Sequence, residues 1–349
     1  MQKLSEGFMK KTAITIRDVS ARCGLSVSTV SKALNNYSDV SAETRELVHR
    51  TAREIGYHPN AIARTLKTNR SSNLGVLFQT ESGLGLTHHF FAAVLNAFKT
   101  ASEARGYDIT FINRNIGDRG MSYLEHCRWR NVDGVVIVCA DFDSPEVQEL
   151  AHSGFPCVTI DREYEGCCCV LNENASGIAQ LVRHAAGLGH RRIALVRGNP
   201  AAVTTERVEG YRSAMSELGL PIYEGYEEEG QYTFPNAAHD AVIRLMKLPS
   251  PPTCILVPDD FASLGARGAL EELGLKFGED VSIGGYDGIT LTQMLNPRLT
   301  TIQQDTQRAG REAADMLISL IESPCPLPPR RVVVPGKLIV GESITPPKG

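Results

Sequence analysis

Three aspartates in the chain lie at or just beyond the ends of segments that read as buried strands. Asp161 closes one such strand, Asp287 ends another, and Asp259 follows the apolar run 254–257. Ligands of open α/β folds bind at the carboxyl ends of the strands. A carboxylate in that position can form strong hydrogen bonds to ligand hydroxyls. The pattern therefore predicts a ligand-binding cleft at the strand ends, and a solvated loop acid is the alternative for each aspartate taken alone.

No constellation for catalysis accompanies these aspartates. The chain has no nucleophile elbow, no phosphate-binding loop and no pair of histidines at metal-ligand spacing. His88 and His89 are adjacent, which is poor geometry for chelation by a helix, so a helix N-terminus or a pocket lip is the better interpretation. The Gly-Leu-Gly at 83–85 lacks the third glycine of a dinucleotide fingerprint. We therefore expect neither an enzyme nor a cofactor.

Nine cysteines are scattered along the chain without a Cys-x-x-Cys pair, which is typical of a reducing compartment. Cys167, Cys168 and Cys169 are consecutive, and neighbouring strand residues point to opposite faces, so small apolar filler is a better interpretation than a metal site. The N-terminal MQKLSEGFMKK lacks the apolar region of a signal peptide, and no apolar run is long enough to span a bilayer. The expected location is the cytoplasm, with no membrane partner.

Predicted strands and helices alternate over the long C-terminal part of the chain, which must position the aspartates. Such alternation is typical of parallel sheets with helices on both faces. About 275 residues exceed one open sheet, so two similar subdomains are expected. The predicted strands are 74–80, 108–113, 134–140, 156–161, 193–197, 254–257 and 282–286, and the predicted helices are 88–105, 121–130, 175–188, 207–218, 237–248, 261–273 and 308–321.

Charge is distributed unevenly between the two ends of the sequence. Residues 1–72 contain 12 Lys and Arg against 6 Asp and Glu, a balance of +6, whereas the remainder contains 24 against 34, a balance of −10. A basic module attached to an acidic body is typical of nucleic-acid binding, because neutralised phosphates supply most of the non-specific affinity. Charge alone leaves a solvated basic surface as an equally good explanation.

The basic segment shows the spacing of a helix-turn-helix. Two short helices with apolar residues on one face are separated by a turn containing Gly, and a third helix follows and runs to Ile55. The second helix would present Val27, Ser28 and Lys32 outward. The residues that delimit the three helices are Thr15 with Asp18 as a capping box, Gly24, Ser26, Ser41 and Gly56.

A segment of barely two helical turns, 60–67, follows the third helix. So short a helix is marginal alone in water, so it needs a partner to order it, and DNA or a second copy of itself are the natural candidates.

Residues 14–67 closely resemble the DNA-binding headpiece and hinge helix of the lactose-repressor/galactose-repressor (LacI/GalR) family. The matching pieces, in the family's order and spacing, are DVS, GLS, STVSKALN, VSAETRE, GYHPN and ARTLK.

The resemblance implies roles for individual residues in binding double-stranded DNA. Contacts to base edges in the major groove are implied for Val27, Ser28 and Lys32. Contacts to phosphates, which position the protein without specifying sequence, are implied for Thr15, Ser26, Thr29, Ser31, Asn35, Ser41, Thr44 and Asn60. Leu66 matches the hinge leucine that wedges open the central base step, with Ala63 and Lys67 beside it in the minor groove. Helix capping is an alternative role for Thr15, Ser26 and Ser41.

The resemblance continues to about residue 345. It rests on LGHRRIALV (188–196), RVEGYRSAM (207–215), GALEELGLKFGEDVSIGGYD (268–287) and PRLTTIQQD (297–305). It implies an α/β core of two periplasmic-binding-protein-like subdomains with parallel sheets, preceded by an all-α helix-turn-helix headpiece. The implied boundaries are a disordered 1–13, a headpiece at 14–59, a hinge and linker at 60–72, and a core at 73–345, with subdomain 1 at about 73–171 and 305–330 and subdomain 2 at about 172–304 and 331–345.

The family match also implies an effector site. Arg207 matches the family's effector-contacting arginine, Tyr232 an aromatic position that stacks on ligand, and Asn172 lies at a crossover between subdomains. Together with Asp161, Asp259 and Asp287 they suit a sugar, because charged groups bond hydroxyls and an aromatic ring covers the apolar face.

Departures from the family pattern leave the effector unnamed. Asp259 stands where Asn is common, Gly288 where a second Asp is common, and His88-His89 where Asn-Pro is frequent. The ending PPKG lacks a leucine heptad, so we expect a homodimer without the tetramerising tail of some members. We expect a repressor on a pseudo-palindromic operator. A regulator whose ligand strengthens DNA binding, or a sugar-binding transport protein, remain alternatives.

Overall fold

The computed structural model describes residues 14–58, 70–79 and 85–348. The chain divides into two compact units, Met1–Ser71 and Ser72–Gly349. Each unit is described by itself. Within the described residues, none of the helices is both long and apolar enough to cross a membrane.

The first unit is a bundle of the three predicted helices: α1 (Ile16–Cys23), α2 (Val27–Leu34) and α3 (Ala42–Ile55). Their apolar faces meet in a small core that includes Val19, Val30 and Val48, which are fully buried. The predicted helix boundaries are confirmed, because Thr15 and Asp18 form a capping box and the side chains of Ser26 and Ser41 cap α2 and α3. Gly24 and Gly56 adopt the left-handed conformation that ends α1 and α3.

Two six-stranded sheets form the second unit, and each is the centre of one lobe. The first lobe has the strand order β13-β7-β6-β5-β1-β2, with all of its pairings parallel. Apolar clusters fill both faces, as expected for a sheet covered on both sides. Its strands are β1 (Asn73–Phe78), β2 (Asp108–Ile112), β5 (Gly134–Cys139), β6 (Cys157–Ile160), β7 (Cys168–Asn172) and β13 (Arg331–Val334), and its helices are α5 (His89–Ala104), α6 (Tyr123–Arg130), α7 (Pro145–His152) and α13 (Thr306–Glu322).

The second lobe has the order β14-β12-β11-β10-β8-β9, in which β14 alone runs antiparallel. It too has apolar clusters on both faces. Its strands are β8 (Ile193–Arg197), β9 (Glu227–Glu229), β10 (Cys254–Leu256), β11 (Ser282–Asp287), β12 (Thr300–Gln303) and β14 (Lys337–Ile339), and its helices are α8 (Asn174–Gly187), α9 (Ala202–Glu217), α10 (Pro235–Met246), α11 (Ala262–Glu272) and α12 (Thr290–Met294). A short 3-10 helix, η1 (Gly85–Thr87), and the ribbon β3 (Asn115–Ile116) and β4 (Arg119–Gly120) complete the described elements.

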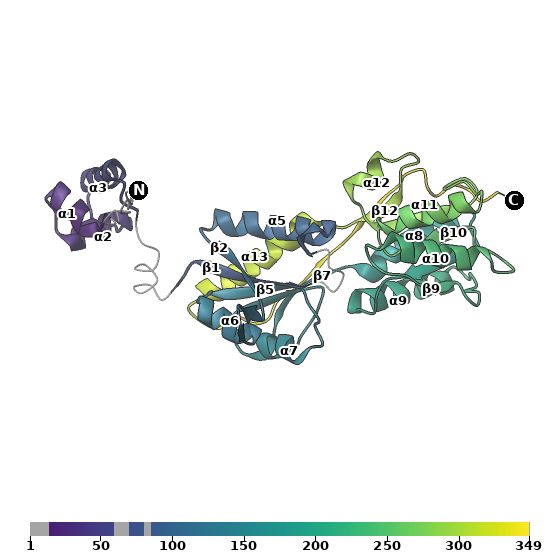
Figure 1. Cartoon of the computed structure of the whole chain (residues 1–349), viewed down its shortest axis with the longest axis horizontal. Helices are drawn as coiled ribbons and strands as arrows, with labels where there is room; N and C mark the ends of the chain where they lie inside the picture. The colour runs from purple at the N-terminus through teal and green to yellow at the C-terminus, as the bar shows by residue number, and fades with distance from the viewer. Residues whose placement is uncertain (1–13, 59–69, 80–84, 349) are drawn as a thin grey trace, which may run out of the picture. The chain divides into compact units, whose positions relative to one another are not determined.

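The chain passes between the lobes three times, after β7, after β12 and after β13 (Figure 1). Helix α13 returns to the first lobe and packs beside α5. The expectation that 331–345 belongs wholly to the second subdomain is wrong for 331–334. Those residues form β13, which pairs in parallel with β7 and buries Val334 in the core of the first lobe.

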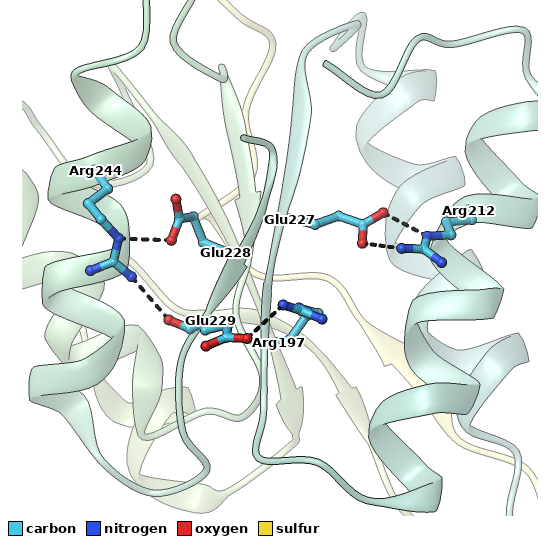
Figure 2. A network of polar contacts seen from close by, with 6 residues as sticks. All are labelled: Arg197, Arg212, Glu227, Glu228, Glu229 and Arg244. Carbon is cyan, nitrogen blue, oxygen red and sulfur yellow. Dashed lines mark hydrogen bonds and ion pairs between the residues drawn. The ribbon is translucent and has the colours of Figure 1, made fainter. Parts of the chain in front are cut away.

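Strand β9 is the exposed edge of the second sheet and consists of three consecutive glutamates. Glu227 accepts two hydrogen bonds from Arg212 of α9, at 2.8 and 2.6 Å, and Glu228 accepts one from Arg244 of α10 at 2.8 Å (Figure 2). Glu229 pairs with Arg197 of β8 at 3.2 Å. The alternation of the strand sends neighbouring glutamates to opposite faces, where helices on both sides supply the arginines.

Candidate functional site

Helix α2 presents an exposed polar surface on the first unit. Val27, at its first turn, is 41% exposed although it is apolar, and Ser28 beside it is also exposed. The N-terminal caps of α2 and α3 are local. Thr29 and Thr44 donate their backbone N–H to Ser26 and Ser41, and the hydroxyls of each pair lie within 2.9 Å. These hydroxyls can therefore cap helices while remaining open to solvent.

Lys32 has a partner that the sequence pattern does not predict. Its Nζ lies 2.5 Å from Asp39 Oδ2, beyond the end of α2, and both side chains are about half exposed. Hydrogen bonding to Asp39 raises the pKa of Lys32. Lys32 is therefore charged and on the surface, with one of its three N–H donors bonded to Asp39.

The remaining residues with predicted DNA contacts fall into two groups. Asn35 ends α2 and donates its side-chain amide to the carbonyl of Ser31 at 2.6 Å, and Thr15 is exposed at the start of α1. The others lie outside the described residues, and these are Asn60, Ala63, Leu66 and Lys67.

Arg207, on α9, is the centre of the polar cluster in the second unit. It is 9% exposed, and its Nε and Nη1 donate to Asn174 Oδ1 at 3.0 Å and to the carbonyl of Pro258 at 2.8 Å. Its guanidinium lies 3.6 Å from the centre of the Tyr286 ring and 5.6 Å from that of Tyr232. This packing holds a permanent cation in a fixed orientation at the carboxyl end of the second sheet.

Two glycines make room for the two tyrosine rings. A Cβ at Gly177 would lie 2.2 Å from the Tyr286 hydroxyl oxygen, and one at Gly198 would lie 2.1 Å from the ring of Tyr232. Tyr232 also bonds the hydroxyl of Thr204 at 2.7 Å. The positions of both rings are thus fixed by contacts that only a glycine permits.

Asp161 and Asp287 come from different lobes, at the ends of β6 and β11. Both have positive φ, 61° and 105°, a conformation that non-glycine residues rarely adopt and that is concentrated at functional sites. Asp161 accepts two hydrogen bonds from Asn172, at 3.1 and 2.8 Å, and Asp287 accepts one from Gln304 at 2.7 Å.

The electrostatics of the cluster link the two lobes. Burial raises the pKa of Asp161 and Asp287, and the charge of Arg207 opposes that rise in both. The same two carboxylates, with Tyr232 and Tyr286, outweigh the effect of burial on Arg207 and raise its pKa. A buried guanidinium is therefore shared by acidic groups from both halves of the core.

Asp259 has a structural task. It is 2% exposed, one oxygen accepts the N–H of Ala262 at the start of α11 at 2.7 Å, and the other accepts the N–H of Thr233. Asp259 therefore positions the segment that contains Tyr232. Its direct contact with a ligand stays a prediction.

The structure adds two residues that sequence analysis did not single out, Asn174 and Tyr286, and it places His89 where a helix N-terminus was expected. Asn174 joins Arg207 to Glu206, to whose Oε2 its amide donates at 3.0 Å, and Tyr286 stacks on Arg207. His89, the first residue of α5, lies 5.1 Å from the ring of Phe261 in the other lobe. The Asn-Glu-Asn run at 172–174 and the aromatic residue before Asp287 were available signals for the first two.

The space beside Arg207 is small in this conformation. The cavity bordered by Thr204, Arg207, Tyr232 and Tyr286 has a volume of about 10 Å³, enough for roughly one water molecule. Small-molecule sites occupy several hundred Å³. A larger ligand would therefore need the lobes or Tyr232 to move. Among the described residues, no three His, Cys, Asp or Glu side chains are grouped to hold a metal ion.

Known proteins match both units. The model for bacterial regulatory proteins of the lacI family matches residues 15–60, and the model for a periplasmic binding protein-like domain matches residues 182–344. The HTH-type transcriptional repressor PurR of Vibrio cholerae serotype O1 (strain M66-2) is 30% identical over 316 residues, covering 88% of this chain and 91% of PurR. The chain belongs to the LacI family of bacterial regulatory proteins.

Solved structures of LacI-family proteins share the whole architecture. The lac repressor dimer bound to operator and the anti-inducer ONPF superimposes with a TM-score of 0.80 at 26% identity, covering 95% of this chain and 99% of the repressor. The complex of the transcriptional regulator CelR with cellobiose gives 0.69 at 28% identity, with the same coverage. The predicted family and fold class are confirmed, and the chain is a DNA-binding transcriptional repressor rather than an enzyme.

Proposed function

We propose that the core of this repressor binds a sugar or sugar derivative between its lobes, and that the ligand controls operator binding. The supporting observation is that Asp161 of one lobe and Asp287 of the other act on the same guanidinium, that of Arg207. A ligand bonded to both carboxylates would favour one lobe angle over others, which is the differential binding that a conformational shift requires. The CelR–cellobiose complex is a precedent among relatives.

On DNA, Val27, Ser28 and Lys32 face base edges in the major groove, and the capping hydroxyls of Ser26 and Ser41 contact phosphates. The protein acts in the cytoplasm as a homodimer on a pseudo-palindromic operator, because two copies of one reading helix match two symmetric half-sites. The apolar side chains of Leu291 and Met294 on α12 are 42% and 78% exposed and are candidates for the contact between copies.

Coupling between the units rests on the sequence-based prediction for residues 60–67, in which Leu66 wedges the central base step. Leu66→Ser should then cost much of the specific affinity, spare non-specific binding and reduce the response to effector. In this proposal the segment is an order–disorder switch that is ordered on the operator and loose off it. Hydrogen exchange over 60–67 in free protein, in protein bound to operator, and in protein with operator and effector tests the switch. Strong protection already present in the free protein would show that the switch is wrong.

A thermal-shift screen against sugars and sugar derivatives tests the effector site, because a ligand that binds the folded state raises its melting temperature. Asp161→Ala, Arg207→Ala and Asp287→Ala should each abolish the shift while leaving operator binding of the free protein near normal. Calorimetry that finds unchanged ligand affinity in all three variants would refute the assignment. A ligand that strengthens operator binding would make this a corepressor-type regulator, which is the alternative.

A further inference from the structure

We propose that Asn174 and Gln304 are positioning residues that transmit effector binding to the angle between the lobes. Each shares a hydrogen bond with a charged side chain of the candidate effector site, and each lies in a crossover, where the chain passes from one lobe to the other. The inference rests on the proposed function and deepens it, because it concerns how the site acts on the lobes.

The first crossover, after β7, connects Asp161 to Arg207 through two asparagines. Asn172, the last residue of β7, donates its backbone N–H and its side-chain amide to Asp161 Oδ1 at 3.1 and 2.8 Å. Asn174, the first residue of α8, donates its amide to the carbonyl of Asn172 at 3.3 Å and accepts the Nε N–H of Arg207 at 3.0 Å. A carboxylate of the first lobe and the guanidinium of the second are therefore bonded to the same short segment.

The second crossover, after β12, has an equivalent amide. Gln304 is buried directly after β12, and its Nε2 donates to Asp287 Oδ1 at 2.7 Å, while its backbone N–H donates to the carbonyl of Asp287 at 3.3 Å. In both sheets the aspartate ends one strand, β6 or β11, and the amide comes from the end of the neighbouring strand, β7 or β12. Each lobe therefore holds its carboxylate by an amide on the strand that leads out of that lobe.

These hydrogen bonds make the geometry of the site and the lobe angle depend on each other. Hinge motion is absorbed by changes in φ and ψ at a few residues at the ends of elements. The amides of both crossovers belong to such residues, so a rotation there moves them relative to the charged groups that they bond. Hydrogen bonds weaken steeply when their angle becomes unfavourable. A ligand that fixes the charged groups therefore favours the lobe angle at which the amides still reach them.

The test separates effector affinity from the effect of the effector on operator binding. Glucose, galactose, ribose and cellobiose are the probes, and any that raises the melting temperature is used in calorimetry and in mobility shifts with and without saturating sugar. Gln304→Met keeps the length of the side chain and removes its amide. Its sugar affinity should stay within about fivefold of wild type, whereas the ratio of operator affinities without and with sugar, about 5–150-fold in typical allosteric proteins, should fall toward one.

Gln180→Met is the matched control. The amide of Gln180, on α8, donates to the carbonyl of Gly336 in the third crossover at 3.4 Å, so its partner is a crossover backbone and not a charged group of the site. This variant should keep the ratio of the wild type. Equal losses in Gln180→Met and Gln304→Met would show that any loosened crossover weakens the response, and would overturn the inference.

Asn174→Asp tests the first crossover while keeping an oxygen for the Nε of Arg207. The new side chain has no N–H to donate to the carbonyl of Asn172, so sugar should still bind while the operator response weakens. The two variants lie in different crossovers, so if one misfolds the other decides. A full operator response in the folded variants, or a loss of sugar affinity as large as the loss of response, would overturn the inference. If no probe binds the wild type, the proposed function itself fails and this inference with it, which is a distinguishable result.

Discussion

Surface aspartates of the N-terminal unit and the aspartates in the interior of the core differ in the direction in which folding shifts their pKa. Asp18 and Asp39 are exposed, and hydrogen bonds from neighbouring residues lower their pKa. Asp260 is buried and Asp161 and Asp287 are partly buried, and burial raises the pKa of all three. The carboxylates of the N-terminal unit lie on a hydrated surface, where their partners can be exchanged when DNA binds. The carboxylates of the core lie among partners that are already in place.

The difference should appear most strongly in the response to salt. Operator affinity should fall by about a thousandfold or more between 50 and 200 mM salt, because a protein that makes about 6–10 phosphate contacts releases that many counterions. Effector affinity should change by less than about twofold, because buried charges are screened much less. Mobility shift and calorimetry over one salt series measure both, and equal salt slopes for the two ligands would contradict the comparison.

Arg207→Met removes the cation shared by the two lobes and leaves Asp161 and Asp287 uncompensated. We expect effector affinity to fall about 100-fold or more, because breaking a buried charged interaction leaves its partner unpaired. Arg212→Met is the matched control on the same helix, since the side chain of Arg212 is 57% exposed and its partner is Glu227 of β9 rather than Asp161 or Asp287. Calorimetry measures the effector affinity of both variants, and a mobility shift shows whether each still binds the operator. Equal losses in the two variants would argue against a special role for Arg207.

Asp260 should make the core more stable as the pH falls. It accepts hydrogen bonds from Thr292, Thr301 and the N–H of Ile289, yet burial raises its pKa to about 6. Since this exceeds its unfolded pKa, its contribution is complete below about pH 4 and is lost as the pH rises through about 6. The loss is on the order of 3 kcal/mol.

Calorimetric melting of wild type and Asp260→Asn at pH 4.5 and pH 7 measures this contribution to the core. The variant should show a smaller difference in stability between the two pH values. An unchanged difference would mean that Asp260 does not titrate in this range. Asp39→Asn is the control in the other unit, where the lowered pKa gives stability that is lost only in acid.

Lys32→Ala should have the smallest effect. If Lys32 makes a base contact, its loss weakens specific binding by about tenfold and relaxes the preference at one position of each half-site. Asp39→Asn should raise operator affinity by less than about threefold, because it frees Lys32 from an exposed ion pair. Selection of bound sequences from a random operator pool measures the base preference at each position. An unchanged consensus for Lys32→Ala would make Lys32 a phosphate contact only.

Features fixed by a few neighbouring residues could be predicted from the sequence. The caps at Thr15, Ser26 and Ser41 lie within three residues of the groups they bond, and Gly56 ends its helix for reasons of backbone geometry alone. The position of Asp161 at a strand end follows from the alternation of elements. Local chemistry decided each of these cases.

Features that depend on distant segments could not be predicted. The partners of Arg207 are Asn174, Pro258 and Tyr286, which lie 33, 51 and 79 residues away in the chain. Asp259 accepts the N–H of Thr233, 26 residues away in the chain. Strand β13 pairs with β7 at the edge of the first sheet, more than 150 residues after β7 in the sequence. The periodicity of a single segment does not predict contacts with segments so far away in the sequence.

The return of α13 and β13 to the first lobe has a consequence for how the protein is synthesised. Strands β1 to β7 are complete by Asn172, but their core lacks α13 until residue 322 and their last strand until Val334 has been made. At about 5–20 residues per second, this interval lasts roughly 10 to 30 seconds on the ribosome. During that time the apolar face later covered by α13 is open, so the nascent first lobe is a natural client for chaperones.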